Sequence, residues 1–206
     1  MDLIMSVEIF SLRGLGQLRV AYDWWDSSLI CSPYLRDEFV WNLYQIDEHR
    51  YALSPRDNYQ GNPLYTSVRD DKEYFLQVQA PFSTNWITHV YRDEELGFEL
   101  KDLNLALFKG FNGRYVGLND QPDFEQITRP PSRALTIRGG YRLRSIYEAP
   151  TKSCFWYLKA VHDSPVPNRM SETISTPGLS FESVLSEHGV HLTAEEMAAF
   201  TAQIAR

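Results

Sequence analysis

The sequence predicts an all-β fold, and three features support this prediction. Apolar and aromatic residues recur in short alternating runs separated by Gly, Pro and Asn, which is typical of strands and turns. Aromatic residues make up 14% of the chain, which suits sheets because rings pack across neighbouring strands. Residues 105–119, LALFKGFNGRYVGLN, contain two such runs joined by Asn112-Gly113, a dipeptide that readily adopts the positive φ angles of a hairpin.

The hairpin phrase occurs a second time near the N-terminus. Residues 12–20, LRGLGQLRV, match residues 108–116, FKGFNGRYV, if the Asn is skipped. Both read as an apolar residue, a basic residue, Gly, an apolar residue, Gly and a polar residue before a strand. A phrase that recurs along one chain indicates a repeat architecture.

The pattern of expected strands occurs three times along the chain. Each occurrence, here called a pass, ends on a strand that contains a tryptophan. These tryptophans are Trp41, Trp86 and Trp156, and an insertion around Pro130-Pro131 explains why the third pass is longer. The expected strands include 29–32, 39–46, 51–53, 64–68, 74–78, 86–90, 134–137, 141–146 and 155–158. The expected core is Trp41, Leu43, Trp86, Phe155 and Leu158 with Leu12, Leu107 and Tyr115.

The C-terminal segment differs from the rest in composition. Residues 164–178 are rich in Pro, Ser and Thr and predict a linker. Ser180 is a suitable cap for a first helix that Gly189 ends, and residues 193–196, TAEE, form a capping box for a second. We therefore expect a body over 1–163, a linker over 164–178 and a short helical hairpin over 179–206.

Three passes of short strands with glycine-turned hairpins resemble a β-trefoil of three roughly forty-residue units. The phrase at 108–116 is similar to one that recurs in fascin-like trefoils, and the weaker threefold pattern covers residues 7–161. The second pass lacks this phrase, and no Trp stands two residues after a Gln, so a ricin-type galactose site has no support. A β-sandwich or an open barrel would have the same alternation of short strands and turns, but the pattern would not repeat three times.

Charge and composition exclude several classes of function. A net charge of −7 argues against a general nucleic-acid binder or an anionic-membrane binder, because phosphate surfaces would repel the chain. No apolar run approaches the roughly eighteen residues of a transmembrane segment, and the N-terminus lacks the features of a signal peptide. We expect a cytoplasmic protein, with release by a non-classical route as an open alternative.

No catalytic, metal-binding or cofactor-binding motif is present. The sequence contains no nucleophile elbow, phosphate loop or HExxH motif, so no catalytic residue is predicted, although a hydrolase is left open. His188 and His191 stand close together but lack a third ligand. Cys31 and Cys154 each adjoin apolar residues, which favours buried thiols over a metal site and leaves a disulfide between them open.

The most suggestive surface segment is a polar loop with two adjacent tryptophans. An indole stacks on the apolar face of a sugar ring while carboxylates accept hydrogen bonds from its hydroxyls. The predicted function is therefore non-catalytic, lectin-like binding of a glycan, and the alternative role for either tryptophan is to cap the open end of a barrel. The candidate ligand-binding residues are Tyr22, Asp23, Trp24, Trp25 and Asp26.

A second hypothesis is a protein-interaction or toxin-type module. It would act through an arginine-rich strand, in which alternation with Leu143 places Arg142 and Arg144 on the outward face, or through the apolar residues of the tail. The tail either packs on the body or is held away by the linker to dock with a protein partner. The candidate partner-binding residues are Arg138, Arg142, Arg144, Phe181, Leu185, Met197 and Phe200.

Overall fold

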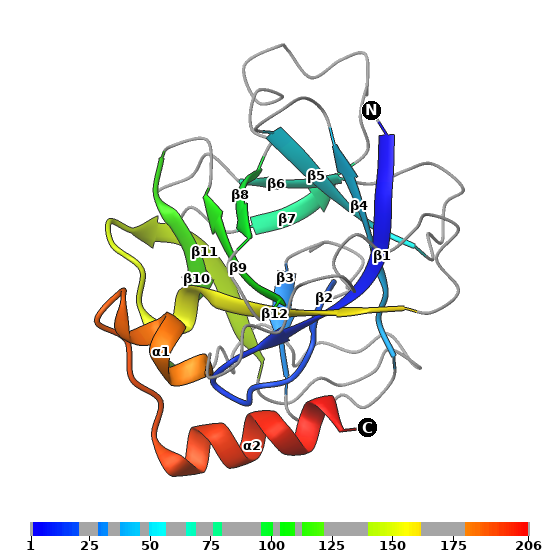
Figure 1. Ribbon diagram of the computed structural model, residues 1–206. Helices are drawn as coiled ribbons and strands as arrows, with labels where there is room; N and C mark the ends of the chain where they lie inside the picture. The colour runs from blue at the N-terminus through cyan, green and yellow to red at the C-terminus, as the bar shows by residue number, and fades with distance from the viewer. Residues whose placement is uncertain are drawn as a thin grey trace, which may run out of the picture.

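The computed structural model shows a strand-rich body with two helices beside it (Figure 1). The second helix runs along one end of the body and carries the C-terminus. The structure describes residues 2–20, 29–32, 38–45, 50–56, 65–68, 76–79, 96–100, 104–109, 113–121, 140–161 and 180–205.

An all-β fold with two short C-terminal helices is confirmed. The pairings between the described strands are antiparallel. A short 3-10 helix, η3 (Lys152–Cys154), precedes the last strand, and the helices α1 (Phe181–Ser186) and α2 (Ala194–Ile204) follow it. The strands are β1 (Asp2–Ser11), β2 (Leu18–Val20), β3 (Leu29–Cys31), β4 (Trp41–Gln45), β5 (Arg50–Pro55), β6 (Tyr65–Val68), β7 (Leu76–Gln79), β8 (Leu96–Leu100), β9 (Leu105–Lys109), β10 (Tyr115–Leu118), β11 (Tyr141–Tyr147) and β12 (Phe155–Ala160).

Six of these strands pair in a ring. β1 lies between β12 and β4, and β4 lies between β1 and β5. The pairing continues through β8 to β9, and β9 pairs with β12, which closes the sequence of pairings. Each of the six strands therefore has a hydrogen-bonded neighbour on both sides, and none of them is an edge strand.

The other six described strands form three hairpins, β2–β3, β6–β7 and β10–β11. In chain order, each hairpin falls between the first and last strand of a set of four, namely β1–β4, β5–β8 and β9–β12. β10 also pairs with β9, and β11 pairs with β3, so two of the hairpins are attached to the same sheet as the ring.

The register of the ring repeats in the three sets of strands. The first and last strands of the sets pair at Val7–Trp41, Tyr51–Leu96 and Ala106–Trp156. Between sets, Trp41 of the first set pairs with Pro55 of the second, and Trp156 of the third set pairs with Ser11 of the first. Ser11 stands four residues after Val7, and Pro55 stands four residues after Tyr51. The same offset is therefore used at both junctions.

The last strand of the second set differs from the sequence-based prediction. This strand is β8, Leu96–Leu100, which was not predicted, whereas the expected strands 86–90, with Trp86, and 134–137 lie outside the described residues. Leu96 holds the register position that Trp41 and Trp156 hold in the other sets. A tryptophan therefore does not mark this position in every set, and the expected tryptophan strand at 86–90 stays a prediction.

The two tryptophans at equivalent positions make equivalent hydrogen bonds. The indole Nε1 of Trp41 donates to the backbone carbonyl of Leu18 at 2.8 Å, and that of Trp156 donates to the carbonyl of Val116 at 3.4 Å. Leu18 and Val116 lie on the second strands of their sets, and both indoles are buried. Each tryptophan thus ties the ring to the hairpin of its own set.

The hairpin predicted at 105–119 is confirmed as β9 and β10, which pair at Lys109 and Tyr115. Gly113 between them has φ of +74°. At the corresponding turn between β1 and β2, Gly14 and Gly16 have φ of +69° and +103°. Positive φ angles favour glycine, so turn geometry explains why both copies of the phrase contain it.

Alternate residues of β1, β9 and β12 enter two different cores. Ile9, Phe108 and Trp156 belong to a cluster on one face, together with Trp41 and Leu43. Residues of the opposite parity belong to a second cluster that includes the tail helices. The members of this second cluster on the three strands are Phe10, Leu105, Leu107 and Phe155.

The burial of the expected core agrees with these two clusters. Trp86 is outside the described residues, and Tyr115 is only partly buried. The expected core residues that are buried are Leu12, Trp41, Leu43, Leu107, Phe155 and Leu158.

The expected linker, 164–178, lies outside the described residues, between Val161 and Ser180. Both predicted helix starts are present: the Ser180 hydroxyl accepts from the Ser183 amide, and Thr193 forms a capping box with Glu196. Neither described helix is long and apolar enough to cross a membrane.

The two indole hydrogen bonds predict unequal effects of removing the indole N–H. Trp41→Phe takes a 2.8 Å donor from a buried carbonyl, so we expect a loss of unfolding free energy of about 1–3 kcal/mol. Trp156→Phe removes a similar volume but a longer bond, so its loss should be smaller. Urea denaturation of both variants measures the difference, and a larger loss for Trp156→Phe would contradict this account.

Candidate functional site

The loop predicted to bind a glycan, Tyr22 to Asp26, lies outside the described residues, but both of its flanking strands are described. β2 ends at Val20 and β3 begins at Leu29, and these two residues are a register pair. Val20 and Leu29 are buried in the first core. The backbone therefore leaves and re-enters the sheet at two adjacent, packed positions.

The arginine-rich strand is only partly as expected. Arg138 is outside the described residues, whereas Arg142 and Arg144 lie on β11 and alternate with the buried Leu143. Arg142 is only 9% exposed, so the outward arginine face that we predicted does not hold for this residue. β11 pairs with β10 on one side and with β3 on the other, and Arg142 lies opposite Ile30 of β3.

The apolar residues of the tail pack against the body. Leu185 and Phe200 are each 1% exposed and belong to the second core, and Phe181 and Met197 lie partly buried at its margin. The Phe200 ring contacts the rings of Tyr157 on β12 and Phe181 on α1, with centroids 5.5 Å and 5.7 Å apart. Of the two arrangements considered for the tail, the structure has the packed one.

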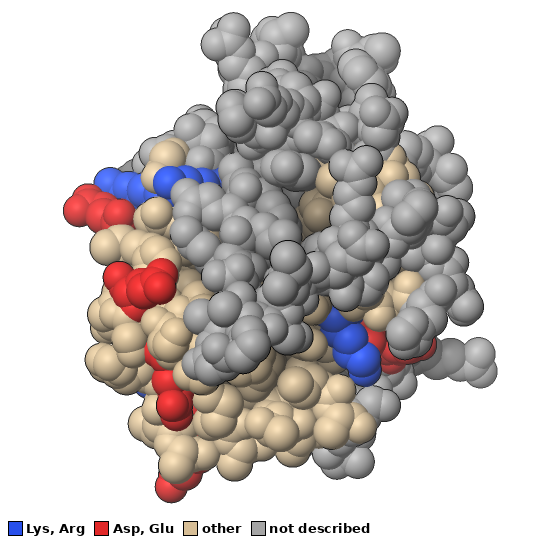
Figure 2. All heavy atoms as spheres, in the orientation of Figure 1, with Lys and Arg blue, Asp and Glu red and all other residues tan. Residues whose placement is uncertain are grey.

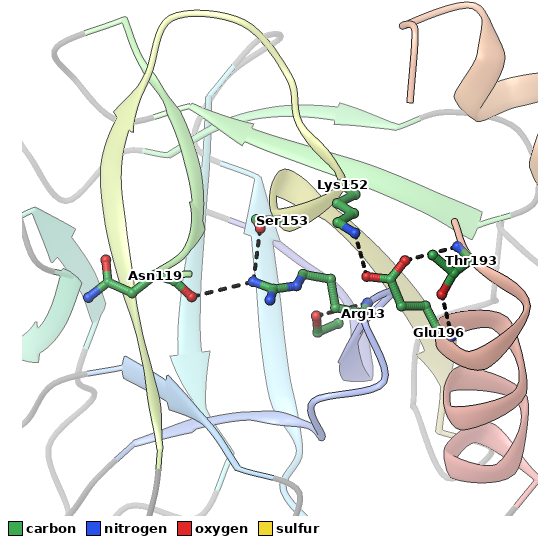
Figure 3. Close-up of polar contacts among 7 residues, drawn as sticks. Arg13, Asn119, Lys152, Ser153, Thr193 and Glu196 are labelled. Carbon is green, nitrogen blue, oxygen red and sulfur yellow. Dashed lines mark hydrogen bonds and ion pairs between the residues drawn. The ribbon is translucent and has the colours of Figure 1, made fainter. Parts of the chain in front are cut away.

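An ion pair joins α2 to the body (Figure 3). The Nζ of Lys152 lies 2.6 Å from Oε1 of Glu196, and Oε2 of Glu196 accepts from the Thr193 amide at 2.9 Å. Partial burial acts to raise the pKa of Glu196, but the hydrogen bonds from Lys152 and Thr193 outweigh it and hold this pKa below its ordinary value. Glu196 therefore remains a carboxylate while it caps the helix.

Arg13 joins three parts of the body next to this ion pair (Figure 3). Its Nη1 donates to the carbonyl of Asn119 at 3.4 Å and to the hydroxyl of Ser153 at 3.1 Å. Its guanidinium also lies 5.7 Å from the centre of the Tyr141 ring. The sequence identified Arg13 only as the basic residue of the repeated phrase, and no local pattern indicated these distant partners.

A buried carboxylate was missed by the sequence reasoning. Glu8 on β1 accepts a hydrogen bond from Nε2 of Gln17, and its other oxygen lies 3.4 Å from Nζ of Lys159. Oε1 of Gln17 accepts from the Phe39 amide at 3.0 Å. These contacts compensate a buried charge and link the β1–β2 turn to the segment before β4, which is a structural role.

The described histidines and cysteines do not assemble a metal-binding cluster. Within the described part of the chain, no three His, Cys, Asp or Glu residues come together as metal ligands. Cys31 and Cys154 are free and buried, and burial raises the pKa of both thiols, which makes them poor nucleophiles. The His188 ring packs on Phe155 with centroids 5.4 Å apart.

The lowered pKa of Glu196 predicts a pH-dependent contribution to stability. Because the folded-state pKa lies below the unfolded value of about 4.3, the contribution is present above that pH and disappears as the pH falls through the folded value. The stability difference between the wild type and Glu196→Gln should therefore be larger at pH 7 than at pH 3. Denaturant titrations measure it, with the exposed neighbour variant Glu195→Gln as the control. An equal difference at both pH values would contradict the prediction.

Comparison of the chain with protein-family models, with curated proteins and with solved structures finds no match. The function is therefore inferred from the residues of this chain.

Proposed function

We propose that the body is a β-trefoil. The proposal is supported by the ring of six paired strands, by one hairpin in each set of four strands, and by the register that repeats in the three sets. A trefoil has three four-strand units around a pseudo-threefold axis, and this arrangement would place equivalent residues at Trp41, Leu96 and Trp156. A scaffold of this kind holds its loops on a rigid frame, and such loops often carry binding residues.

We propose further that the protein recognises a glycan without catalysis, through the loop Tyr22 to Asp26. The observation that carries the proposal is the pairing of Val20 with Leu29, which fixes both ends of the segment that contains two tryptophans and two aspartates. In this mechanism Trp24 or Trp25 stacks on the apolar face of a sugar ring, and Asp23 and Asp26 accept hydrogen bonds from its hydroxyls.

The protein-interaction alternative is less well supported by the described side chains. Binding through the tail would require apolar residues that are accessible, whereas Leu185 and Phe200 are buried against the body. Binding through the arginine strand would require an outward basic face, whereas Arg142 is buried. Glycan recognition through the loop requires neither accessible apolar residues in the tail nor an outward basic face on the arginine strand.

A glycan array tests the proposed site. The wild type should bind at least one glycan, and the double variant Trp24→Ala/Trp25→Ala should lose most of that binding, because it lacks both indole faces on which a sugar ring would stack. Trp24→Phe/Trp25→Phe keeps aromatic rings at both positions and should retain part of the affinity. Asp23→Asn/Asp26→Asn should weaken binding because the acceptors lose their charge.

Two outcomes would refute the glycan hypothesis or its site. Absence of binding by the folded wild type would remove the function itself. Binding that is unchanged in the double alanine variant would keep the function and move the site away from this loop.

A further inference from the structure

The body holds α2 by three side chains that lie on one face of the helix. Glu196, Phe200 and Gln203 stand at positions i, i+4 and i+7, which succeed one another along a single helical stripe. Recognition of an amphipathic helix in a groove typically uses anchors with this spacing. The partners of the three anchors come from separate parts of the chain outside α2.

The first anchor is electrostatic. Glu196 pairs with Lys152 of η3, whose Nζ lies 2.6 Å from the carboxylate, and the Glu196 side chain is 18% exposed. The surface over the two helices is otherwise mostly uncharged, with scattered acidic groups (Figure 2). The exposed acidic residues of the helical tail include Glu182, Glu187 and Glu195. Lys152 thus offers a positive charge to an acidic helix.

The second anchor is apolar. Phe200 is 1% exposed and lies edge-on against Tyr157 of β12. Below it the second core contains Phe10, Leu107 and Phe155, which are contributed by three strands of the ring. Phe200 is the only aromatic side chain among the three anchors, so this position has the largest apolar contribution of the three.

The third anchor binds backbone rather than side chains. The carboxamide of Gln203 donates to the carbonyl of Gly14 and accepts from the amide of Gly16 at 3.1 Å. The helix also approaches this turn closely, because a Cβ atom added at Gly14 would lie 2.5 Å from the Cβ of Ala199. The glycines of the β1–β2 turn therefore leave room for the helix and present one acceptor and one donor to it.

We propose that η3, β12 and the β1–β2 turn form a docking site for an amphipathic helix, and that this site accepts α2 of a second copy of the chain. The three anchor partners, Lys152, Tyr157 and the Gly14–Gly16 backbone, all belong to the body. A helix supplied by another molecule can therefore meet the same groups. The occupant must combine an acid, an aromatic residue and a carboxamide at i, i+4 and i+7, and α2 itself carries that combination.

Two physical properties determine how the site would be used. An isolated helix of eleven residues is only marginally stable, so α2 depends on its docking site for much of its helicity. Its covalent connection to the body keeps its effective concentration high, so the chain's own α2 occupies the site under ordinary conditions. Exchange with a second copy then requires that the resident α2 be weakened.

A peptide-binding experiment with the full-length chain tests the proposal. The probe is a fluorescent peptide of residues 190–206, and its binding is measured by fluorescence anisotropy. The full-length variant Phe200→Ala/Gln203→Ala, whose resident helix lacks two anchors, should bind the peptide at least tenfold more tightly than the wild-type protein. The matched control is Thr201→Ala, an exposed position on the same helix, which should bind as weakly as the wild type.

Variant peptides test whether the three anchors are recognised. The full-length Phe200→Ala/Gln203→Ala protein is called the opened variant. The Phe200→Ala peptide and the Gln203→Ala peptide should each bind it at least fivefold more weakly than the wild-type peptide does. Equal binding of all peptides, or no binding to an opened variant that circular dichroism shows to be folded, would overturn the proposal.

A charge reversal keeps the proposal testable if the opened variant does not fold. The Lys152→Glu protein should prefer the Glu196→Lys peptide over the wild-type peptide, while a protein with Lys152 intact should show the opposite preference. Inversion of the preference supports docking at η3, and the same preference in both proteins would contradict it.

Discussion

β12 pairs with two strands that are far apart in the sequence, β1 at the N-terminus and β9 in the third set of strands. These two ladders close the ring, so each of its six strands has a hydrogen-bonded neighbour on both sides. Closure also brings Trp41 and Trp156 into the same core. The hairpins β2–β3 and β10–β11 belong to the same sheet as this frame.

Closure explains why some strands are apolar on both faces. Residues 5 to 12 of β1 and its continuation are all buried, with Met5, Val7 and Ile9 in the first core and Phe10 and Leu12 in the second. Strands covered on both faces have few exposed positions and therefore do not alternate simply between apolar and polar residues. The helical tail supplies the second cover for β1, β9 and β12, and it is consequently part of the folded unit.

Local signals predicted local structure well. The Asn-Gly turn, the two helix caps and the alternating strands at 41–45 and 141–147 were recognised because each depends on neighbouring residues. The strand at 96–100 was missed because the register position that it supplies is held by Leu96 and not by a tryptophan. Contacts such as Gln203 with Gly14 join residues far apart in sequence, and no local pattern encodes them. The pairing of β11 with β3 likewise joins residues that are far apart in the sequence.

Amide hydrogen exchange at β12 tests the closure of the ring most directly. In an antiparallel strand, alternate amides point to opposite neighbours, so those of β12 are shared between β1 and β9. We expect the amides of residues 155–158 to exchange as slowly as those of residues 41–44 on β4, which also has two neighbours. Fast exchange at alternate residues of β12, as in an edge strand, would contradict a closed ring.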